Sequence, residues 1–224
     1  MLVKIRRQKS PESDPYWQTF ECPVSGNETV STILDRLNYT DDLYDTSGNR
    51  APLIRWETSC SQKMCGACAM VINGTPGLAC GTFIRNLDCS NALVLEPLSK
   101  FPVISDLIVD RNIIAKNLKL AESYSDQSSA AKPNEYFQMY ATAKCLKCGL
   151  CLEVCPNYKR GADFFGAQFA NESYLLHRNS DNRKNNIKKE YQRHFSAGCS
   201  KALSCVKICP MKIDTLASMA KMNR

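Results

Sequence analysis

The chain has 224 residues, of which 44% are hydrophobic and 13 are cysteine, and its formal net charge is +7. This length suffices for two modest domains, and the apolar content can supply a core for each. Thirteen cysteines far exceed ordinary usage, so they indicate either a disulfide framework or metal ligation.

The N-terminus and the hydropathy pattern argue against two kinds of segment. Residues 1–10 carry four basic side chains with no apolar run behind them, which is unlike a secretory signal peptide. No apolar run approaches the ~18–20 residues that a transmembrane helix needs. We therefore expect a soluble chain on the reducing side of a membrane, where disulfides are disfavoured.

Charge is distributed unevenly along the chain. Residues 1–100 hold 10 Lys and Arg against 11 Asp and Glu, net −1, whereas residues 101–224 hold 19 against 11, net +8. A basic surface favours anionic partners such as acidic proteins, nucleic acid or lipid headgroups. An ordinary solvated face explains the same charge equally well.

Residues 1–100 follow the pattern of a small β-rich domain. Short apolar segments predict strands, and the apolar residues between 30 and 37 recur at the spacing of one helix face. The predicted elements are strands at 2–5 and 17–22, a turn with a capping box at 25–28, a helix over 30–37, a hairpin of 69–72 with Leu78 onward around Asn73-Gly74, and a closing strand at 93–98. This order indicates a β-grasp domain.

Residues 101–224 are predicted to be mainly helical, wrapped around cysteine loops. A segment ending in Cys-Pro occurs at 145–156 and again at 199–210, which is a partial internal repeat. The fold class is thus α+β, with a β-grasp plant-type ferredoxin domain over 1–100 and an α-helical bacterial-ferredoxin-like domain over 101–224. Helical patterns cover 103–120, 136–144, 163–178, 185–195 and 215–222, Asp214 can cap the last helix, and 121–134 read as a surface loop.

The first cysteine group has the spacing of a plant-type ferredoxin. Cys60, Cys65 and Cys68 are separated by four and two residues, and Cys80 follows eleven residues later. This spacing predicts a [2Fe-2S] cluster. The alternative is a four-cysteine zinc site, which usually shows two closely spaced pairs, and Cys80 has no such partner.

The second group is the bacterial [4Fe-4S] run. Cys145, Cys148 and Cys151 are separated by two residues each, and Cys155 follows after three more, directly before Pro156. In proteins with two clusters, the fourth cysteine of such a run ligates the other cluster. The run therefore predicts three ligands for one cluster and one for its neighbour.

The third group resembles the second but lacks one cysteine. Cys199, Cys205 and Cys209 match its first, third and fourth positions, and Ala202 stands at the second. Cross-ligation then assigns Cys145, Cys148, Cys151 and Cys209 to a [4Fe-4S] cluster. Only Cys155, Cys199 and Cys205 remain, which predicts a [3Fe-4S] cluster; the alternative is a [4Fe-4S] cluster with water or another side chain on its fourth iron.

Two cysteines and two histidines fall outside these sets. Cys22 and Cys89 are expected to be small buried apolar residues, as free cysteines often are. His177 and His194 are interpreted as ordinary helix residues, because the cysteines already suffice as ligands. No catalytic residue is expected in this chain.

Four segments together resemble the iron–sulfur subunits of succinate dehydrogenases and fumarate reductases. They are SCSQKMCGACAMVING at 59–74, LEPLSKFPVISDLIVDR at 95–111, CLKCGLCLEVCPN at 145–157 and CSKALSCVKICPMKI at 199–213. The resemblance covers nearly the whole chain and is strongest to the menaquinone-linked branch.

The resemblance implies a role in electron transfer. A partner flavoprotein would interconvert succinate and fumarate at FAD, and single electrons would pass through [2Fe-2S], [4Fe-4S] and [3Fe-4S] clusters to or from a quinone, by this likeness menaquinone, at a membrane-anchor subunit that can carry haem b. The chain would then lie peripherally on the cytoplasmic face of the cell membrane.

The chain departs from the ubiquinone-linked branch at two places. Asn157, Tyr158, Lys159 and Arg160 stand where that branch has a tryptophan, and Ser200 stands where it has a histidine. The quinone site of that branch is therefore not supported. Lys159, Arg160, Lys201 and Lys207 are candidates for contact with lipid or an anchor subunit, and also for plain surface charge.

Three other functions are weighed against this one. The chain could serve another flavoprotein reductase, or act as a free-standing soluble polyferredoxin carrier, although the fused domains suit fixed partners better. A nucleic-acid binder is disfavoured, because the basic helices lack interleaved aromatic residues and the cysteine spacing suits clusters. The direction of electron flow cannot be predicted from the sequence.

Overall fold

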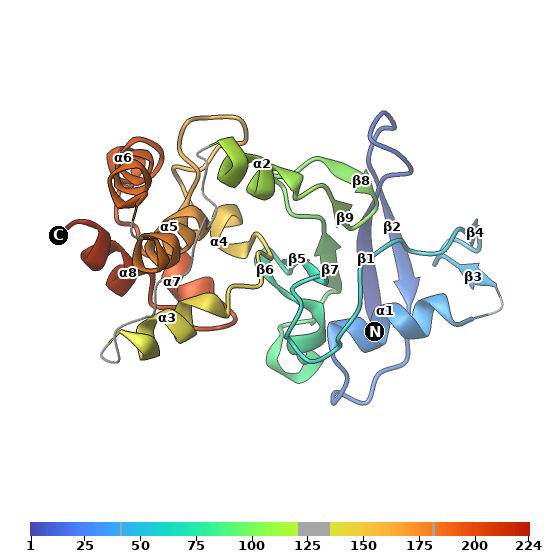
Figure 1. The fold of residues 1–224 in the computed structure, drawn as a ribbon. Helices are drawn as coiled ribbons and strands as arrows, with labels where there is room; N and C mark the ends of the chain where they lie inside the picture. The colour runs from blue at the N-terminus through green and yellow to red at the C-terminus, as the bar shows by residue number, and fades with distance from the viewer. Residues whose placement is uncertain (41, 121–134, 181) are drawn as a thin grey trace. The chain divides into compact units, whose positions relative to one another are not determined.

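Strands and helices separate along the chain in the computed structural model, which describes residues 1–40, 42–120, 135–180 and 182–224 (Figure 1). The chain forms two units, Met1–Asp110 and Arg111–Arg224. In the described residues every strand belongs to the first unit, and the second contains only helices and loops. This confirms the predicted α+β class.

A five-stranded mixed sheet forms the body of the first unit, in the order β2-β1-β7-β5-β6. The first strand pairs in parallel with β7, with Val3 opposite Leu93, and the other neighbours are antiparallel. Alternate side chains of β1 and β7 are buried, which is the pattern of a sheet covered on one face. The strands are β1 (Leu2–Arg7), β2 (Tyr16–Glu21), β5 (Ala69–Ile72), β6 (Thr75–Leu78) and β7 (Leu93–Glu96).

Helix α1 (Val30–Asn38) buries the apolar face predicted for it, since Val30, Ile33, Leu34 and Leu37 are all buried. The prediction that residues 25–28 form a capping box for this helix is wrong. Thr29 caps the helix by accepting a bond of 3.3 Å from the Thr32 N–H. The Glu28 carboxylate accepts from the backbone N–H of residues 25 and 26, so it closes a turn ahead of the helix.

The predicted hairpin forms, but its second strand lies earlier than expected. Asn73 and Gly74 both have positive φ, 46° and 75°, as a two-residue type I′ turn requires. Strand β6 therefore starts at Thr75 and ends at Leu78. The remaining short elements of this region are β3 (Leu43–Tyr44), β4 (Arg50–Ala51), η1 (Ala79–Gly81) and η2 (Ile84–Asn86).

Residues 103–120 do not form the single helix that the sequence predicted. They form β8 (Val103–Ser105), β9 (Ile108–Val109) and then α2 (Asn112–Leu120). Asp106, in the turn between the two strands, has a positive φ of 47°, which is incompatible with a helix. The cause is non-local, because the Asp106 side chain is fixed by residues far away in sequence.

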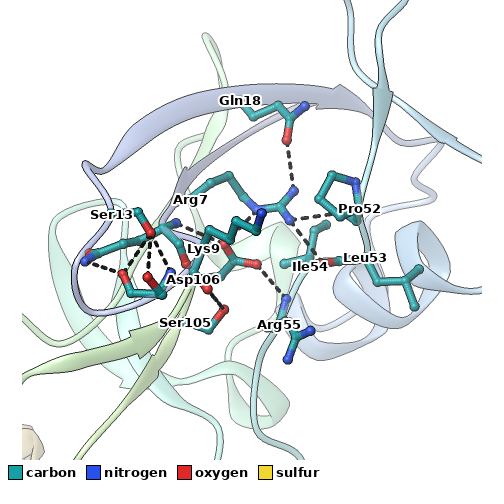
Figure 2. Close-up of polar contacts among 12 residues, drawn as sticks. Arg7, Lys9, Ser13, Gln18, Pro52, Leu53, Ile54, Arg55, Ser105 and Asp106 are labelled. Carbon is teal, nitrogen blue, oxygen red and sulfur yellow. Dashed lines mark hydrogen bonds and ion pairs between the residues drawn. The ribbon is translucent and has the colours of Figure 1, made fainter.

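An ion pair buried in the first unit fixes that turn (Figure 2). Arg7 Nε lies 3.0 Å from Asp106 Oδ1, and the two residues are 1% and 3% exposed. The Asp106 carboxylate also accepts from the backbone N–H of Gln8 at 3.0 Å and of Arg55 at 2.9 Å. These bonds hold the β8–β9 turn in the first unit, which consequently extends to Asp110, beyond the boundary placed at residue 100.

The second unit is a helical domain arranged around α5, which packs against α2, α3, α4, α6 and α8. Its apolar core includes Phe169, Tyr174, Tyr191 and Phe195, each at most 1% exposed. The helices are α3 (Tyr136–Ala143), α4 (Leu150–Glu153), α5 (Ala167–Asn179), α6 (Lys184–His194), η3 (Ser196–Gly198), α7 (Ser204–Ile208) and α8 (Thr215–Met222).

Most helix predictions for this unit are confirmed. Asp214 caps α8 by accepting a bond of 3.0 Å from the Ala217 N–H. Helix α5 starts four residues later than predicted. Gly166 precedes it with φ of 81° and ψ of −178°, and a Cβ there would meet Leu152 Cδ2 at 2.3 Å. The loop predicted at 121–134 lies outside the described residues.

Both histidines lie in helices, as predicted. His194 ends α6, is 3% exposed and stacks on Phe165 with ring centroids 4.0 Å apart. Its Nδ1 donates to the Asp163 carbonyl oxygen at 2.8 Å. His194 is therefore a packing residue of the helical core.

Candidate iron–sulfur cluster sites

The first cysteine group lies on a loop that bends around its own thiols. Residues 52–68 contain no helix or strand. Ser61, Lys63 and Gly66 have positive φ values of 52°, 62° and 76°. Successive residues in alternating right- and left-handed conformations turn backbone N–H groups toward the inside of a loop.

Several of those N–H groups point at sulfur. The Met64 N–H donates to Cys60 Sγ at 3.2 Å, and the Lys63 N–H donates to Cys80 Sγ at 3.3 Å. Longer bonds of 3.5 Å run from residue 62 to Cys60 and from residue 67 to Cys65. Such donors stabilise negative charge on sulfur, which a thiolate-ligated iron cluster carries.

The β5–β6 hairpin brings the last two cysteines of this group together. Cys68 directly precedes β5 and Cys80 lies just beyond β6, while Ala69 pairs with Leu78 across the hairpin. The two sulfur atoms are consequently 3.4 Å apart. A separation of eleven residues in sequence thus becomes a contact, as the predicted turn required.

The two ends of the group differ in environment. Bonds from the backbone N–H of residues 62 and 64 lower the pKa of the Cys60 thiol to about 7. Burial raises the pKa of the Cys68 thiol to about 12, and Cys68 is 3% exposed. The loop therefore leaves Cys60 partly exposed and encloses Cys68 and Cys80.

The second and third cysteine segments have the same backbone conformation. Lys147 and Gly149, with φ of 52° and 88°, lead into α4, and Lys201 and Leu203, with φ of 58° and 60°, lead into α7. Cys151 and Cys205 lie in these two short helices. The partial repeat seen in the sequence is therefore a repeat of structure.

Cysteines of both segments line one cavity in the second unit. They are Cys145, Cys148 and Cys151 of the second segment, and Cys205 and Cys209 of the third. In the described parts of the chain no three His, Cys, Asp or Glu side chains are grouped tightly enough to hold a single metal ion. The ligands of a multi-iron cluster stand further apart than those of one ion, because the inorganic core lies between them.

Electrostatic coupling links cysteines both within and between the two segments. Burial raises the pKa of the Cys151 thiol well above its usual value, and nearby thiols, Cys148 and Cys145 foremost, raise it further. Burial also raises the pKa of the Cys205 thiol, with Cys155 and Cys199 the next causes. Buried thiolates of this kind need a positively charged partner, which bound iron would supply. The donor set fits iron–sulfur clusters.

Three polar residues of this cavity were not found by sequence reasoning. Gln168 and Asn171 on α5, and Thr215 at the start of α8, line it alongside the cysteines. All three are buried, and Asn171 Nδ2 donates to Thr215 Oγ1 at 3.1 Å. No motif marks them, because their position depends on how α5 and α8 pack.

The positions that depart from the ubiquinone-linked pattern have a structural role. Asn157 Nδ2 donates to the Gly198 carbonyl oxygen at 2.7 Å, and Ser200 Oγ donates to Asn157 Oδ1 at 2.7 Å. These two bonds join the segment after Cys155 to the segment around Cys199. Lys159, Arg160, Lys201 and Lys207 are exposed.

The two remaining cysteines lie apart from these groups. Cys22 is 1% exposed and burial raises the pKa of its thiol, which confirms the expectation of a buried apolar residue. Cys89 is only partly buried, so the same expectation is met less fully. Among the described helices, none has the length and apolar character needed to cross a bilayer.

Comparison with known families matches both units to iron–sulfur domains. Residues 2–116 match a family described as "2Fe-2S iron-sulfur cluster binding domain". Residues 141–213 match a family described as "4Fe-4S dicluster domain". The matched ranges contain all eleven cysteines of the three groups.

Two relatives share most of their length with this chain. The "Succinate dehydrogenase iron-sulfur subunit" of Bacillus subtilis is 30% identical over 231 residues, covering 98% of this chain and 90% of the relative. The "Fumarate reductase iron-sulfur subunit" of Escherichia coli is 28% identical over 228 residues, covering 96% and 88%.

A solved structure shares the fold. A chain of the structure titled "Mycobacterium smegmatis Sdh1 complex in the apo form" superposes with a TM-score of 0.74 at 21% identity, covering 99% of this chain and 94% of that one.

Proposed function

This chain belongs to the family of succinate dehydrogenase and fumarate reductase iron–sulfur subunits, and we propose that it carries single electrons between a partner FAD protein and a quinone at a membrane anchor. In this proposal the chain itself is not catalytic. Succinate and fumarate are interconverted on the flavoprotein, and the chain links that reaction to the quinone.

The proposed ligands fall into three sets. Each set draws on cysteines that the structure brings near one another or couples electrostatically. The sets are Cys60, Cys65, Cys68 and Cys80 for [2Fe-2S]; Cys145, Cys148, Cys151 and Cys209 for [4Fe-4S]; and Cys155, Cys199 and Cys205 for [3Fe-4S].

The shared cavity of the second unit is the observation that carries this proposal. Cys209 lines the cavity together with Cys145, Cys148 and Cys151, although it belongs to the other segment. Cross-ligation requires this meeting of two segments. Cys205 also reaches the cavity, as is reasonable for a ligand of the adjacent set.

Protein groups around the sulfurs perform three tasks in this role. Cysteine thiolates hold the clusters, backbone N–H groups at residues 62–64 stabilise charge on sulfur, and burial of Cys68 and Cys148 keeps water from the ligands. The bound clusters supply one-electron redox chemistry, which neither an amino-acid side chain nor the backbone provides here.

Several observations support the proposed partners. Both relatives are named as subunits, hence as members of larger assemblies. The net charge of +8 on residues 101–224 suits a position near anionic lipid headgroups on the cytoplasmic face. Residues 157–160 and Ser200 lack the tryptophan and the histidine of the ubiquinone-linked branch, so we propose menaquinone at a haem-bearing anchor as the electron partner.

Affinity purification of the chain from its native membranes tests this function. We expect an FAD protein and a small membrane subunit to copurify, with flavin that fumarate oxidises. Haem in the anchor would support menaquinone. Recovery of a soluble flavoprotein alone, or of no partner, would instead favour a different reductase or a mobile carrier.

Electron paramagnetic resonance (EPR) tests the clusters separately. The air-oxidised protein should show a paramagnetic oxidised [3Fe-4S] signal, and the reduced protein should show [2Fe-2S] and [4Fe-4S] signals. Cys80→Ala should abolish the [2Fe-2S] signal, whereas the matched variant Cys89→Ala should retain all three. Loss of a cluster in Cys89→Ala would contradict the proposed ligand sets.

A further inference from the structure

The side chain of Gln168 presents a buried hydrogen-bond donor at the cysteine cavity. Gln168 is the second residue of α5, is 3% exposed and lines the cavity with Cys145, Cys148, Cys151 and Cys209. Its Nε2 atom is fully buried and has no hydrogen-bond partner among the described residues. Leaving such a donor unpaired is costly, so native proteins rarely tolerate it.

The neighbouring side-chain amide, that of Asn171, does not supply an acceptor for Gln168 Nε2. Asn171 lies one turn further along α5 and lines the same cavity, but its Nδ2 already donates to Thr215 Oγ1. Its Oδ1 also lacks a partner, so the Gln168 and Asn171 side chains are not bonded to each other. The donor of Gln168 is therefore available to an acceptor in the cavity.

A cluster in this cavity supplies suitable acceptors. Sulfide and thiolate sulfurs accept hydrogen bonds, and their negative charge increases when the cluster gains an electron. A donor consequently stabilises the reduced state more than the oxidised state and raises the reduction potential. Gln168 Nε2 is itself fully buried, so this interaction is weakly screened by water.

We propose that Gln168 Nε2 donates a hydrogen bond to a sulfur of the [4Fe-4S] cluster and sets its reduction potential. The inference rests on the proposed ligand set of Cys145, Cys148, Cys151 and Cys209. Gln168 is a tuning residue: it is absent from the cysteine motifs, holds no iron and touches no substrate.

An EPR-monitored redox titration of the purified complex tests the proposal in Gln168→Met, which keeps the length of the side chain but removes the donor. We expect the equilibrium between oxidised and reduced [4Fe-4S] cluster to shift about tenfold toward the oxidised state. This shift lowers the reduction potential of the cluster by about 59 mV for one electron. The [2Fe-2S] potential should not change, because Gln168 does not belong to that unit.

A second variant separates tuning from structural disturbance. Gln168→Glu keeps the shape and should lower the potential more at high pH than at low pH, because deprotonation replaces the donor with a charge. Ser173→Ala is the matched control, since Ser173 is also buried on α5 with an unpartnered hydroxyl but does not line the cavity. It should leave the potential unchanged.

Two results would overturn the inference in distinguishable ways. A wild-type [4Fe-4S] signal with unchanged potentials in both Gln168 variants would exclude the hydrogen bond and leave the ligand set intact. A wild-type complex without a [4Fe-4S] signal would refute the ligand set and the inference with it.

Discussion

Ser200 Oγ donates a hydrogen bond of 2.7 Å to Asn157 Oδ1, and this contact joins the two cysteine segments of the helical unit. Asn157 also donates to the Gly198 carbonyl oxygen, so one side chain holds both sides of Cys199. The proposed [3Fe-4S] ligands Cys155 and Cys199 lie on the two segments that these bonds connect.

Replacing Asn157 should weaken the retention of that cluster. Asn157→Ala removes both bonds and Ser200→Ala removes one, at ~1 kcal/mol for each bond. We expect the oxidised [3Fe-4S] EPR signal to decay faster under mild denaturant in the order Asn157→Ala, Ser200→Ala, wild type. Equal decay rates for all three proteins would contradict a joining role.

Ala202 offers a direct test of the three-ligand assignment. Ala202 is exposed, and its position in the third segment corresponds to that of Cys148 in the second. The residue that follows each of them, Leu203 and Gly149, has a positive φ. Ala202→Cys should complete a fourth ligand, abolish the oxidised [3Fe-4S] signal and raise the iron content by about one atom per chain. Ala202→Val is the control and should keep the signal; a retained signal in Ala202→Cys would count against the assignment.

The buried ion pair of Figure 2 should contribute strongly to the stability of the first unit. Asp106→Asn leaves the Arg7 charge buried and unpaired, which typically costs ~3–5 kcal/mol. The unfolding transition that bleaches the [2Fe-2S] chromophore should move to lower denaturant concentration.

An exposed ion pair of the same unit provides the control. Arg6 and Glu96 lie 3.8 Å apart with side chains 43% and 29% exposed, so Glu96→Gln should cost only ~0–1 kcal/mol. A similar loss in Asp106→Asn and Glu96→Gln would show that burial of the Arg7 pair does not matter.

His177 should make the stability of the second unit depend on pH. Burial, and then the nearby charges of Arg178 and Lys184, lower the pKa of His177 below its ordinary value. The unfolded chain therefore binds a proton at His177 more readily than the folded chain does. The contribution of neutral His177 to folding stability is fully present above about pH 6.5, and it is lost as the pH falls through the lowered pKa.

Thermal unfolding at pH 7.5 and pH 5.5 measures this effect. The drop in Tm between the two pH values should be smaller in His177→Gln than in the wild type, because the variant has no group to protonate there. The difference should be a few degrees at most for a chain of this size. An identical drop in both proteins would exclude His177 as the cause.

Local signals predicted much of this molecule. These signals are the spacing of the cysteines, the Asn73-Gly74 turn and the Asp214 cap, and each can be read from neighbouring residues. The structure contains the turn and the cap as predicted. The helix predicted over 103–120 was wrong because the structure there depends on non-local contacts. The β8–β9 turn exists because Asp106 bonds to Arg7, Gln8 and Arg55, and no window of sequence around residue 106 contains those partners.

The start of α5 was predicted wrongly, and the polar residues of the cavity were not predicted, for the same reason. Gly166 is needed because Leu152 lies where a Cβ would be, and Leu152 belongs to a different helix. Gln168 reaches the cysteines only through the packing of α5 in the second unit. A polar residue in a helical pattern gives no sign that it is buried.

The meeting of Cys209 with Cys145, Cys148 and Cys151 constrains how the protein is made. On the proposed ligand sets, the [4Fe-4S] site lacks a ligand until residue 209 has left the ribosome, and the [3Fe-4S] site lacks two until residues 199–205 have done so. Only the [2Fe-2S] site is complete once residue 80 has been made. Maturation of the helical unit must therefore follow synthesis of the chain through residue 209, and a chain truncated before residue 199 would leave the cell's assembly machinery with one cluster to insert.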